Sequence, residues 1–158
     1  MIDAIHSRPN VLPWPPMLLV LAALSAIALG ALWPAPGSGD DWLTGVGFVL
    51  LGLGVVLDAW AILTMRAAGT NILPNRGADA LVTWGPFRAS RNPIYLANTL
   101  LLIGIGLAFG NLWFVLMAFV SAVLVDRLAI RREERHLASR FGDDWTAYAA
   151  RTPRWLIR

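Results

Sequence analysis

The chain has 158 residues, of which 57% are hydrophobic and 15% are charged, and its mean hydropathy is +0.59. Soluble domains are typically about 45–50% apolar and about 25% charged, so this composition excludes an ordinary soluble domain. All 13 basic residues are arginines that flank apolar segments, so the net charge of +3 indicates membrane topology, not nucleic-acid binding. Cysteine is absent and His6 and His136 are far apart, so we predict no metal site.

Long apolar runs predict four membrane-spanning helices. Residues 94–125 contain no ionisable group except Tyr95 and are too numerous for one crossing, which takes about 20 residues. Gly110-Asn111 at their midpoint is a turn pair, so we expect a helical hairpin there. The predicted spans are residues 15–33, 43–65, 91–109 and 112–131, and a cytosolic helical tail covers 132–158. The sequence thus predicts one all-α integral membrane domain over 1–158.

The first apolar run has a second interpretation, a cleaved signal peptide. Its apolar region is long, Asp3 precedes it, and three further spans follow. We therefore expect a retained anchor.

Arginine placement predicts the orientation in the bilayer. Residues 66–93 hold four arginines and the segment after Val125 holds eight, whereas residues 34–42 hold none. Cytoplasmic loops carry the excess of arginine, so we expect both termini in the cytoplasm of a multi-pass protein of a bacterial inner membrane. Tryptophans fall near the predicted span ends, as an aromatic belt requires; they are Trp14, Trp33, Trp42, Trp84 and Trp113.

The charged C-terminal segment is expected to continue the fourth span as a helix that ends at Gly142. Asp143 or Asp144 could cap a second helix to about Ala150, which Pro153 ends. An apolar stripe able to fold back on the bundle or the membrane surface recurs at helical spacing: Leu137, Phe141, Trp145 and Tyr148.

Glu133 and Glu134, the only glutamates, stand where the fourth helix leaves the membrane. They could form a solvated, self-neutralising surface with the neighbouring arginines. Alternatively, because adjacent helical positions point about 100° apart, one glutamate faces inward to a ligand while the other faces water.

Asp58 lies inside the second span, where an acid is costly and is a functional candidate. It could equally be a structural partner for an arginine or a backbone group. For Asp126-Arg127 we favour the structural interpretation.

The segment "GPFRASRNPIY" precedes the third span. Pro93 suits the first turn of a helix and disfavours helix at Asn92, so Asn92 is expected to be its N-cap. Backbone N–H groups at this helix start could bind an anion or a carboxylate.

These residues resemble a known family. "LVTWGPFRASRNPIYLAN", an apolar hairpin and "REERHLASRFGDDWTAYAARTPR" together are similar to the integral-membrane methyltransferases related to isoprenylcysteine carboxyl methyltransferase and phospholipid methyltransferases. The resemblance covers about Leu81 to Arg154, and it is the combined pattern that is specific.

The resemblance implies a methyltransferase (EC 2.1.1 type) that uses S-adenosylmethionine as cofactor and methylates a lipophilic acceptor entering from the bilayer. Glu134, Arg131 and Arg91 are the expected catalytic residues: the arginines would orient an anionic part of the acceptor and Glu134 would polarise or deprotonate it. The cofactor-binding residues carried over are Asp79, Ala80, Leu81, Val82, Phe87, Asn92, Pro93, Ile94, Tyr95, Glu133 and Tyr148.

Several positions depart from the family pattern. Phe87 and Trp145 replace tyrosines and lose a hydroxyl, and Asn92 replaces the histidine of the prenylcysteine branch. Ala129 stands where the prenylcysteine enzymes have an arginine that would contact the substrate carboxylate, which counts against a prenylcysteine substrate. Two other functions stay open, an NADPH-dependent membrane reductase of related architecture and a non-catalytic membrane scaffold.

Overall fold

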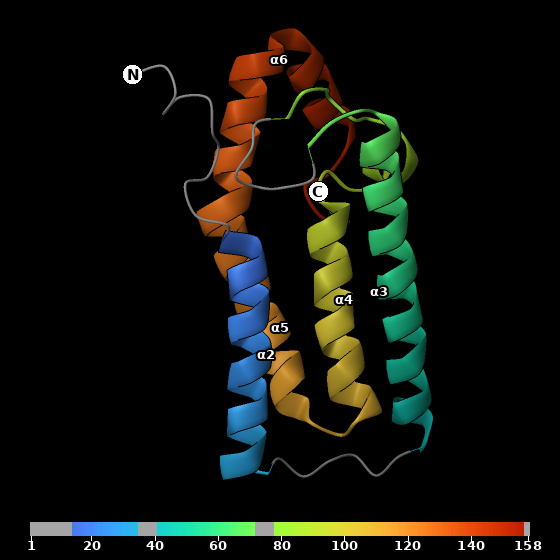
Figure 1. The fold of residues 1–158 in the computed structure, drawn as a ribbon, viewed down its shortest axis with the longest axis vertical. Helices are drawn as coiled ribbons and strands as arrows, with labels where there is room; N and C mark the ends of the chain where they lie inside the picture. Colours follow the sequence, from blue (N-terminus) through green and yellow to red (C-terminus); the bar gives the residue numbers. More distant parts are fainter. Residues whose placement is uncertain (1–13, 35–40, 72–77, 157–158) are drawn as a thin grey trace.

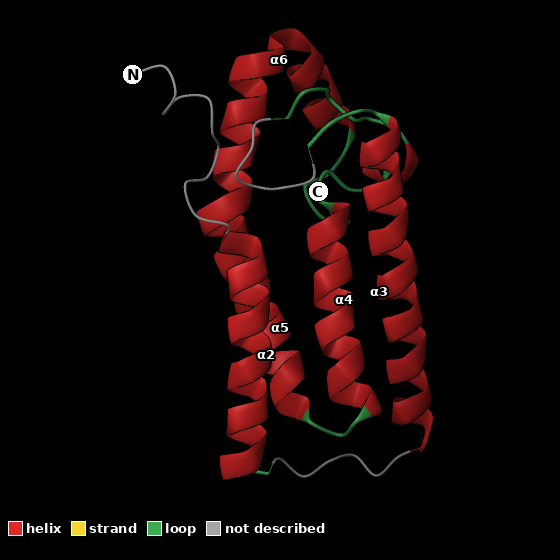
Figure 2. Ribbon diagram, in the orientation of Figure 1, coloured by secondary structure: helices red, strands yellow, loops and turns green. Residues whose placement is uncertain are grey.

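The computed structural model describes residues 14–34, 41–71 and 78–156. In these residues every regular element is helical (Figure 2). The elements are α2 (Trp14–Leu32), α3 (Asp41–Ala67), the 3-10 turn η1 (Gly85–Arg88), α4 (Pro93–Ala108), α5 (Leu112–Val125), the π-helical turn η2 (Asp126–Ile130) and α6 (Arg131–Arg151). The predicted all-α fold is confirmed. The N-terminal residues 1–13, and parts of the segments 34–42 and 66–93 on which the predicted orientation rests, lie outside the described residues.

The helices α2 to α5 run alongside one another (Figure 1). The helix α2, the helix α3 and the continuous helix from α5 into α6 are long and apolar enough to cross a membrane, and α4 is a shorter apolar helix of 16 residues. Large apolar side chains on their outer faces, such as Leu24, Val56 and Phe119, are more than half exposed, as lipid-facing residues are. The predicted integral membrane architecture is thus confirmed. The helix α4 begins at Pro93 and not at residue 91, because Pro93 disfavours helical geometry before it.

The helices α3 and α4 pack with their backbones in contact. A Cβ atom added to Gly47 of α3 would lie 2.3 Å from the backbone nitrogen of Ala108, and one added to Gly104 would lie 2.8 Å from that of Leu51. Only glycine fits at both positions. Such small-residue contacts hold helices together where lipid provides no hydrophobic driving force.

The predicted hairpin between α4 and α5 is confirmed. Gly110 adopts φ 67°, a left-handed conformation that suits glycine, and the Asn111 side chain accepts a hydrogen bond from the Trp113 backbone. The Asn111 amide also donates to the Ala26 carbonyl at 3.3 Å, and the Trp113 indole donates to the Trp33 carbonyl at 2.7 Å. The turn therefore also fixes the neighbouring end of α2.

The C-terminal segment folds back to the start of α4. Gly142, at φ 51° and ψ −119°, breaks α6 as predicted, and the second half of α6 continues to Arg151. The carbonyl of Pro153 then accepts a hydrogen bond from the Arg91 backbone at 2.9 Å. The carbonyl of Arg154 accepts hydrogen bonds from the Ser90 hydroxyl at 3.1 Å and the Asn92 amide at 3.0 Å. This return places Pro153 and Arg154 beside the predicted site.

Candidate functional site

A pocket of about 410 Å³ lies where the charged α6 meets the ends of the apolar helices. The helix α2 contributes Pro15, Pro16 and Leu19, and α3 contributes Asp58, Ile62 and Met65. The start of α4 and the residues before it contribute Phe87, Arg91, Asn92, Pro93, Ile94, Tyr95 and Asn98. The helix α6 contributes Glu133, Glu134, His136, Leu137 and Trp145. The pocket therefore joins a charged side to an apolar side.

The start of α4 forms one wall, but Asn92 does not cap the helix as predicted. It occupies the N-cap position, yet its side chain makes no capping bond and donates to the Arg154 carbonyl instead. The returning C-terminal segment, which offers that carbonyl, is the physical reason. The first intrahelical bond runs from Leu96 N–H to Asn92, so the N–H groups of Ile94 and Tyr95 have no acceptor within the helix.

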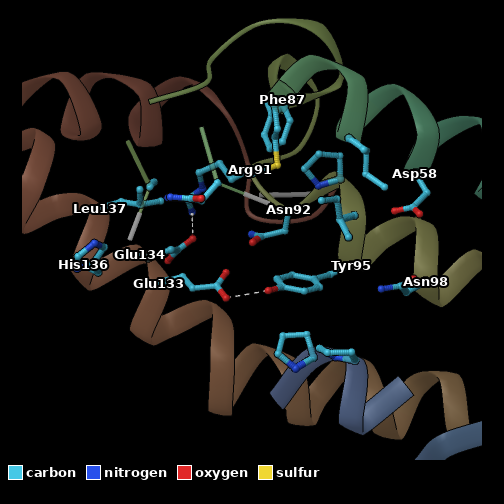
Figure 3. A pocket seen from close by; sticks show the side chains of 18 of the residues that line it. Asp58, Phe87, Arg91, Asn92, Tyr95, Asn98, Glu133, Glu134, His136 and Leu137 are labelled. Atoms are coloured by element: carbon cyan, nitrogen blue, oxygen red, sulfur yellow. Dashed lines mark hydrogen bonds and ion pairs between the residues drawn. The ribbon is translucent and has the colours of Figure 1, made fainter. Parts of the chain in front are cut away.

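The Tyr95 hydroxyl donates to Oε1 of Glu133 at 2.8 Å (Figure 3). The tyrosine is on the first turn of α4 and the glutamate is on the first turn of α6. The bond thus joins two segments that are 38 residues apart. It orients the Glu133 carboxylate within the pocket.

Both glutamates line the pocket, so the expectation that only one faces inward is wrong. Arg91 lies 3.4 Å from Oε1 of Glu134, and Arg154 lies 3.1 Å from Oε1 and 2.5 Å from Oε2. These two guanidinium groups draw the Glu134 side chain inward, and only 14% of it is exposed. Glu134 is therefore not part of a solvated surface, as one of the two interpretations of the pair expected.

Arg154 is the centre of an ion-pair network. It also contacts Asp126 at 3.2 Å, and Asp126 in turn accepts from Arg131 at 3.0 Å. The hydrogen bond to Glu134, together with the charges of Glu134 and Asp126, raises the pKa of Arg154 above its usual range against the opposing effect of burial. Asp126 has the structural role that the sequence favoured.

Arg131 does not reach the pocket. Its side chain is 57% exposed and pairs with Asp126, on the outer side of the network. Arg127 is also exposed and Ala129 is fully buried, so neither of the two arginines nearest Ala129 on the helix replaces the arginine that is missing there. Of the three expected catalytic residues, the structure brings Arg91 and Glu134 together.

The other residues carried over from the family divide into two groups. Phe87, Asn92, Pro93, Ile94, Tyr95 and Glu133 line the pocket. Asp79, Ala80, Leu81, Val82 and Tyr148 do not line it. Asp79 instead accepts from Asn71 at 2.6 Å and lies 3.7 Å from Arg140, and Tyr148 donates to the Phe87 carbonyl at 2.7 Å. Burial raises the pKa of Tyr148, so this phenol is a hydrogen-bond donor that fixes the wall.

Arg91 is held on three sides. Its guanidinium lies 5.6 Å from the centroid of the Trp145 ring, its Nη2 atom faces Glu134, and its backbone bonds Pro153. Trp145, in the apolar stripe, packs edge-on against Tyr148. The stripe thus folds back on the bundle, one of the two predicted outcomes. The indole that replaces the family tyrosine is a platform for the arginine.

Two buried polar atoms in this pocket lack a hydrogen-bond partner among the described residues, Nε of Arg91 and Nε2 of His136. Burial, and to a lesser extent the charge of Arg140, lowers the pKa of His136 below its ordinary 6.5. His136 is therefore neutral at pH 7. Buried polar atoms without partners are rare in native structures, and here both lie where a ligand could bind them.

His136 and Asn98 line the pocket and were not predicted from the sequence, and neither was the contact of Arg154 with the lining residue Glu134. From the sequence, Arg154 is indistinguishable from the other arginines of the basic tail, because no local motif indicates that the chain folds back to the start of α4. Asn98 had a usable signal: it is one helical turn after Tyr95 in an otherwise apolar helix, so both side chains share a face. No group of three potential metal ligands occurs within residues 14–34, 41–71 and 78–156.

Comparison with known proteins identifies relatives of this chain. The chain is 34% identical over 86 residues to a cobalt-zinc-cadmium resistance protein of Cupriavidus metallidurans, covering 54% of this chain and 39% of that protein. It is 27% identical over 162 residues to a nickel-cobalt-cadmium resistance protein of Alcaligenes xylosoxydans, covering 99% of this chain and 68% of that protein.

A third relative is protein-S-isoprenylcysteine O-methyltransferase B of Arabidopsis thaliana, with 29% identity over 117 residues, 71% of this chain and 58% of the relative. The chain thus spans between 39% and 68% of the length of these relatives. The phospholipid methyltransferase family profile matches residues 42–144, well over half of the chain. The chain belongs to the phospholipid methyltransferase family.

Proposed function

On the basis of this family membership, we propose that the chain transfers a methyl group from S-adenosylmethionine to a lipophilic acceptor that enters from the bilayer. The observation that carries the proposal is the two-sided pocket. Charged residues of α6 and the start of α4 line one side, and residues of α2 and α3 that are apolar except for Asp58 line the other. A pocket of about 410 Å³ with a few polar groups in an apolar lining is typical of small-molecule sites.

The polar groups match the functional groups of S-adenosylmethionine. Nε of Arg91 and the N–H groups of Ile94 and Tyr95 are donors suited to its carboxylate. Glu133, held by Tyr95, is an acceptor suited to the ammonium or ribose hydroxyl groups. Phe87 and Leu137 supply apolar surface for the adenine. The donor set therefore fits the cofactor.

When bound, S-adenosylmethionine supplies an electrophilic methyl group on a positively charged sulfur. The chain contributes alignment and exclusion of water, which account for much of the catalysis in an in-line displacement. Glu133 and the start of α4 orient the cofactor side of the pocket, and Ile62 and Met65 keep the acceptor side apolar.

Glu134 has a positioning role in this proposal. Both of its carboxylate oxygens are engaged by Arg91 and Arg154, so accepting a proton would break charge-assisted hydrogen bonds. We therefore reassign Glu134 from deprotonating the acceptor to fixing Arg91 beside the cofactor.

The orientation follows from the arginines. The α6 end of the bundle carries most of them, so we propose that this end faces the cytoplasm of a bacterial cell, where S-adenosylmethionine is made available. Arg91 and Arg154 share Glu134 and Arg154 also pairs with Asp126, which leaves about one uncompensated positive charge for the phosphates of NADPH and disfavours the reductase alternative.

The test is equilibrium binding of labelled S-adenosylmethionine to the purified chain in detergent micelles. We expect saturable binding that Glu133→Gln weakens at least about tenfold, because a charge-assisted hydrogen bond is lost. Asp143→Asn is the matched control, since it removes the same charge from an exposed position on α6. Absence of binding by a folded wild-type chain would refute the function, as would thermal stabilisation by NADPH alone. Binding without methyl transfer to any component of a lipid extract would favour the scaffold alternative.

A further inference from the structure

Asp58 is an acid inside the apolar part of α3. Apart from Asp41 at the start of α3, it is the only aspartate or glutamate in α2, α3, α4 and α5. At about 1.5 Å per residue it lies about 13 Å along the axis from the end of α3 at Ala67. An acid at this depth is costly and is kept only for a function or a partner.

Asp58 has no hydrogen-bonding or ion-pair partner among residues 14–34, 41–71 and 78–156. Its carboxylate makes no hydrogen bond or ion pair with any residue in the described part of the chain, and it does not pair with Arg66, two turns later on the same helix. The nearby Thr64 hydroxyl bonds the Trp60 carbonyl instead. The structural alternative that the sequence left open is therefore not realised among the described residues.

Asp58 lines the pocket on the side away from the glutamates. Figure 3 shows Asp58 and Asn98 on one side of Tyr95, and Glu133 and Glu134 on the other. The Asn98 side chain, like that of Asp58, makes no hydrogen bond within the described residues. The pocket thus has a second polar subsite, which comes from α3 and α4 alone.

The surroundings of this subsite are apolar. Ile62 and Met65 follow Asp58 at spacings of four and seven residues, so the three side chains share one face of α3. Pro15, Pro16 and Leu19 of α2 line the same pocket, while α2 packs chiefly on α5 and α3 packs chiefly on α4. A lipophilic molecule that passes between α2 and α3 would bring its polar end to Asp58 and Asn98.

We propose that Asp58 and Asn98 recognise the polar end of the methyl acceptor, and that this end is a hydrogen-bond donor, an amine or a hydroxyl group. The inference rests on the proposed function, because it names the acceptor side of the same pocket. A carboxylate accepts hydrogen bonds from amines and hydroxyl groups and repels another carboxylate. The subsite therefore selects against carboxylate acceptors, in agreement with the missing arginine at Ala129.

The test measures binding of three probes with one chain length, dodecylamine, dodecanol and dodecanoate. The full chain is titrated in micelles with S-adenosylhomocysteine present, and affinity is taken from the shift in Tm. We expect the amine and the alcohol to bind at least about tenfold more tightly than dodecanoate, because a buried unpaired charge opposes the acid. Asp58→Asn should remove most of this discrimination. Asp41→Asn, the same change at the exposed end of α3, should retain it.

Labelled S-adenosylmethionine binding is measured on the same samples, so the two proposals fail separately. Unchanged discrimination in Asp58→Asn, or equal binding of all three probes to wild type, overturns the subsite and leaves the methyltransferase proposal standing. Loss of S-adenosylmethionine binding in folded Asp58→Asn assigns the acid to the cofactor and also overturns the subsite. If the wild-type chain discriminates among the three probes but does not bind S-adenosylmethionine, only the methyltransferase proposal is overturned. If Asp58→Asn does not fold, Asn98→Leu replaces it, with the same expected loss of discrimination.

Discussion

Tyr95 of α4 and Glu133 of α6 are joined by a hydrogen bond of 2.8 Å from the phenol to the carboxylate. This bond links the apolar bundle to the charged helix that extends from it. Both residues line the pocket, and Tyr95 lies between the two glutamates on one side and Asp58 on the other (Figure 3). Loss of the bond should therefore affect ligand binding more than folding.

Tyr95→Phe tests that expectation. Removing the hydroxyl takes one partner from Glu133, so we expect S-adenosylmethionine affinity to fall about fivefold, equivalent to about 1 kcal/mol. Binding is measured by equilibrium dialysis, with Tm as the check on folding. An unchanged dissociation constant would show that Glu133 does not need this bond.

Tyr148→Phe should reduce the stability of the chain more than its affinity for S-adenosylmethionine. Tyr148 does not itself line the pocket, and its hydroxyl donates to the carbonyl of Phe87, so we expect the free energy of unfolding to fall by about 1 kcal/mol. The dissociation constant of S-adenosylmethionine should stay within about twofold, which corresponds to less than about 0.5 kcal/mol. A large loss of affinity at unchanged Tm would restore the direct cofactor contact that the family resemblance implies.

Arg154→Ala should destabilise the chain through Glu134 and Asp126, which lose their shared partner. Because about a third of the Arg154 side chain is exposed, we expect the free energy of unfolding to fall by about 1–2 kcal/mol, less than the loss for a fully buried ion pair. Glu134→Gln should cost less in the Arg154→Ala background, with a coupling of about 1 kcal/mol in the double-mutant cycle. Arg132→Ala, at an exposed position on α6, should change stability by less than about 0.5 kcal/mol. If the losses of unfolding free energy in Arg154→Ala and Glu134→Gln are additive in the double variant, the ion-pair network is contradicted.

Gly104→Ala should destabilise the contact between α3 and α4. The added Cβ would lie 2.8 Å from the Leu51 nitrogen, so backbone must move, and overpacking of this kind costs about 1–3 kcal/mol. Gly52→Ala is the control on α3, because nothing lies within 4 Å of its Cβ position. That variant should be neutral, or more stable by up to about 1 kcal/mol through helix propensity. Equal Tm values for the two variants would argue against close packing.

His136 should make stability depend on pH. Its pKa is lowered in the folded chain, so the unfolded chain binds the proton more readily. The resulting stability is fully present above about pH 6.5 and is lost as the pH falls from there toward the folded-state pKa. Between pH 7.5 and 5.5, wild-type Tm should therefore fall more than that of His136→Phe. Parallel profiles would show that His136 is not buried as a neutral group.

The sequence determined the membrane architecture. Long apolar runs predict α2 and α3 to within two residues, because lipid requires a long helix that satisfies its own backbone. Gly110-Asn111 also predicted its turn, since glycine at positive φ is a local property of the chain. The candidate residues at the start of α4 and at Glu133 followed from motif and helix-start chemistry.

The tertiary structure alone decided which of those residues meet. Arg131 and Arg154 are both arginines of a basic tail, yet only Arg154 reaches Glu134, because the chain turns back after Gly142 and bonds Ser90 and Asn92. Asn92 loses its predicted capping bond to that same return. Asp58 was ambiguous from sequence, because a buried acid and a ligand-binding acid look alike until its neighbours are known. Local propensity acts within a few residues, whereas these contacts depend on side chains brought together from distant parts of the chain.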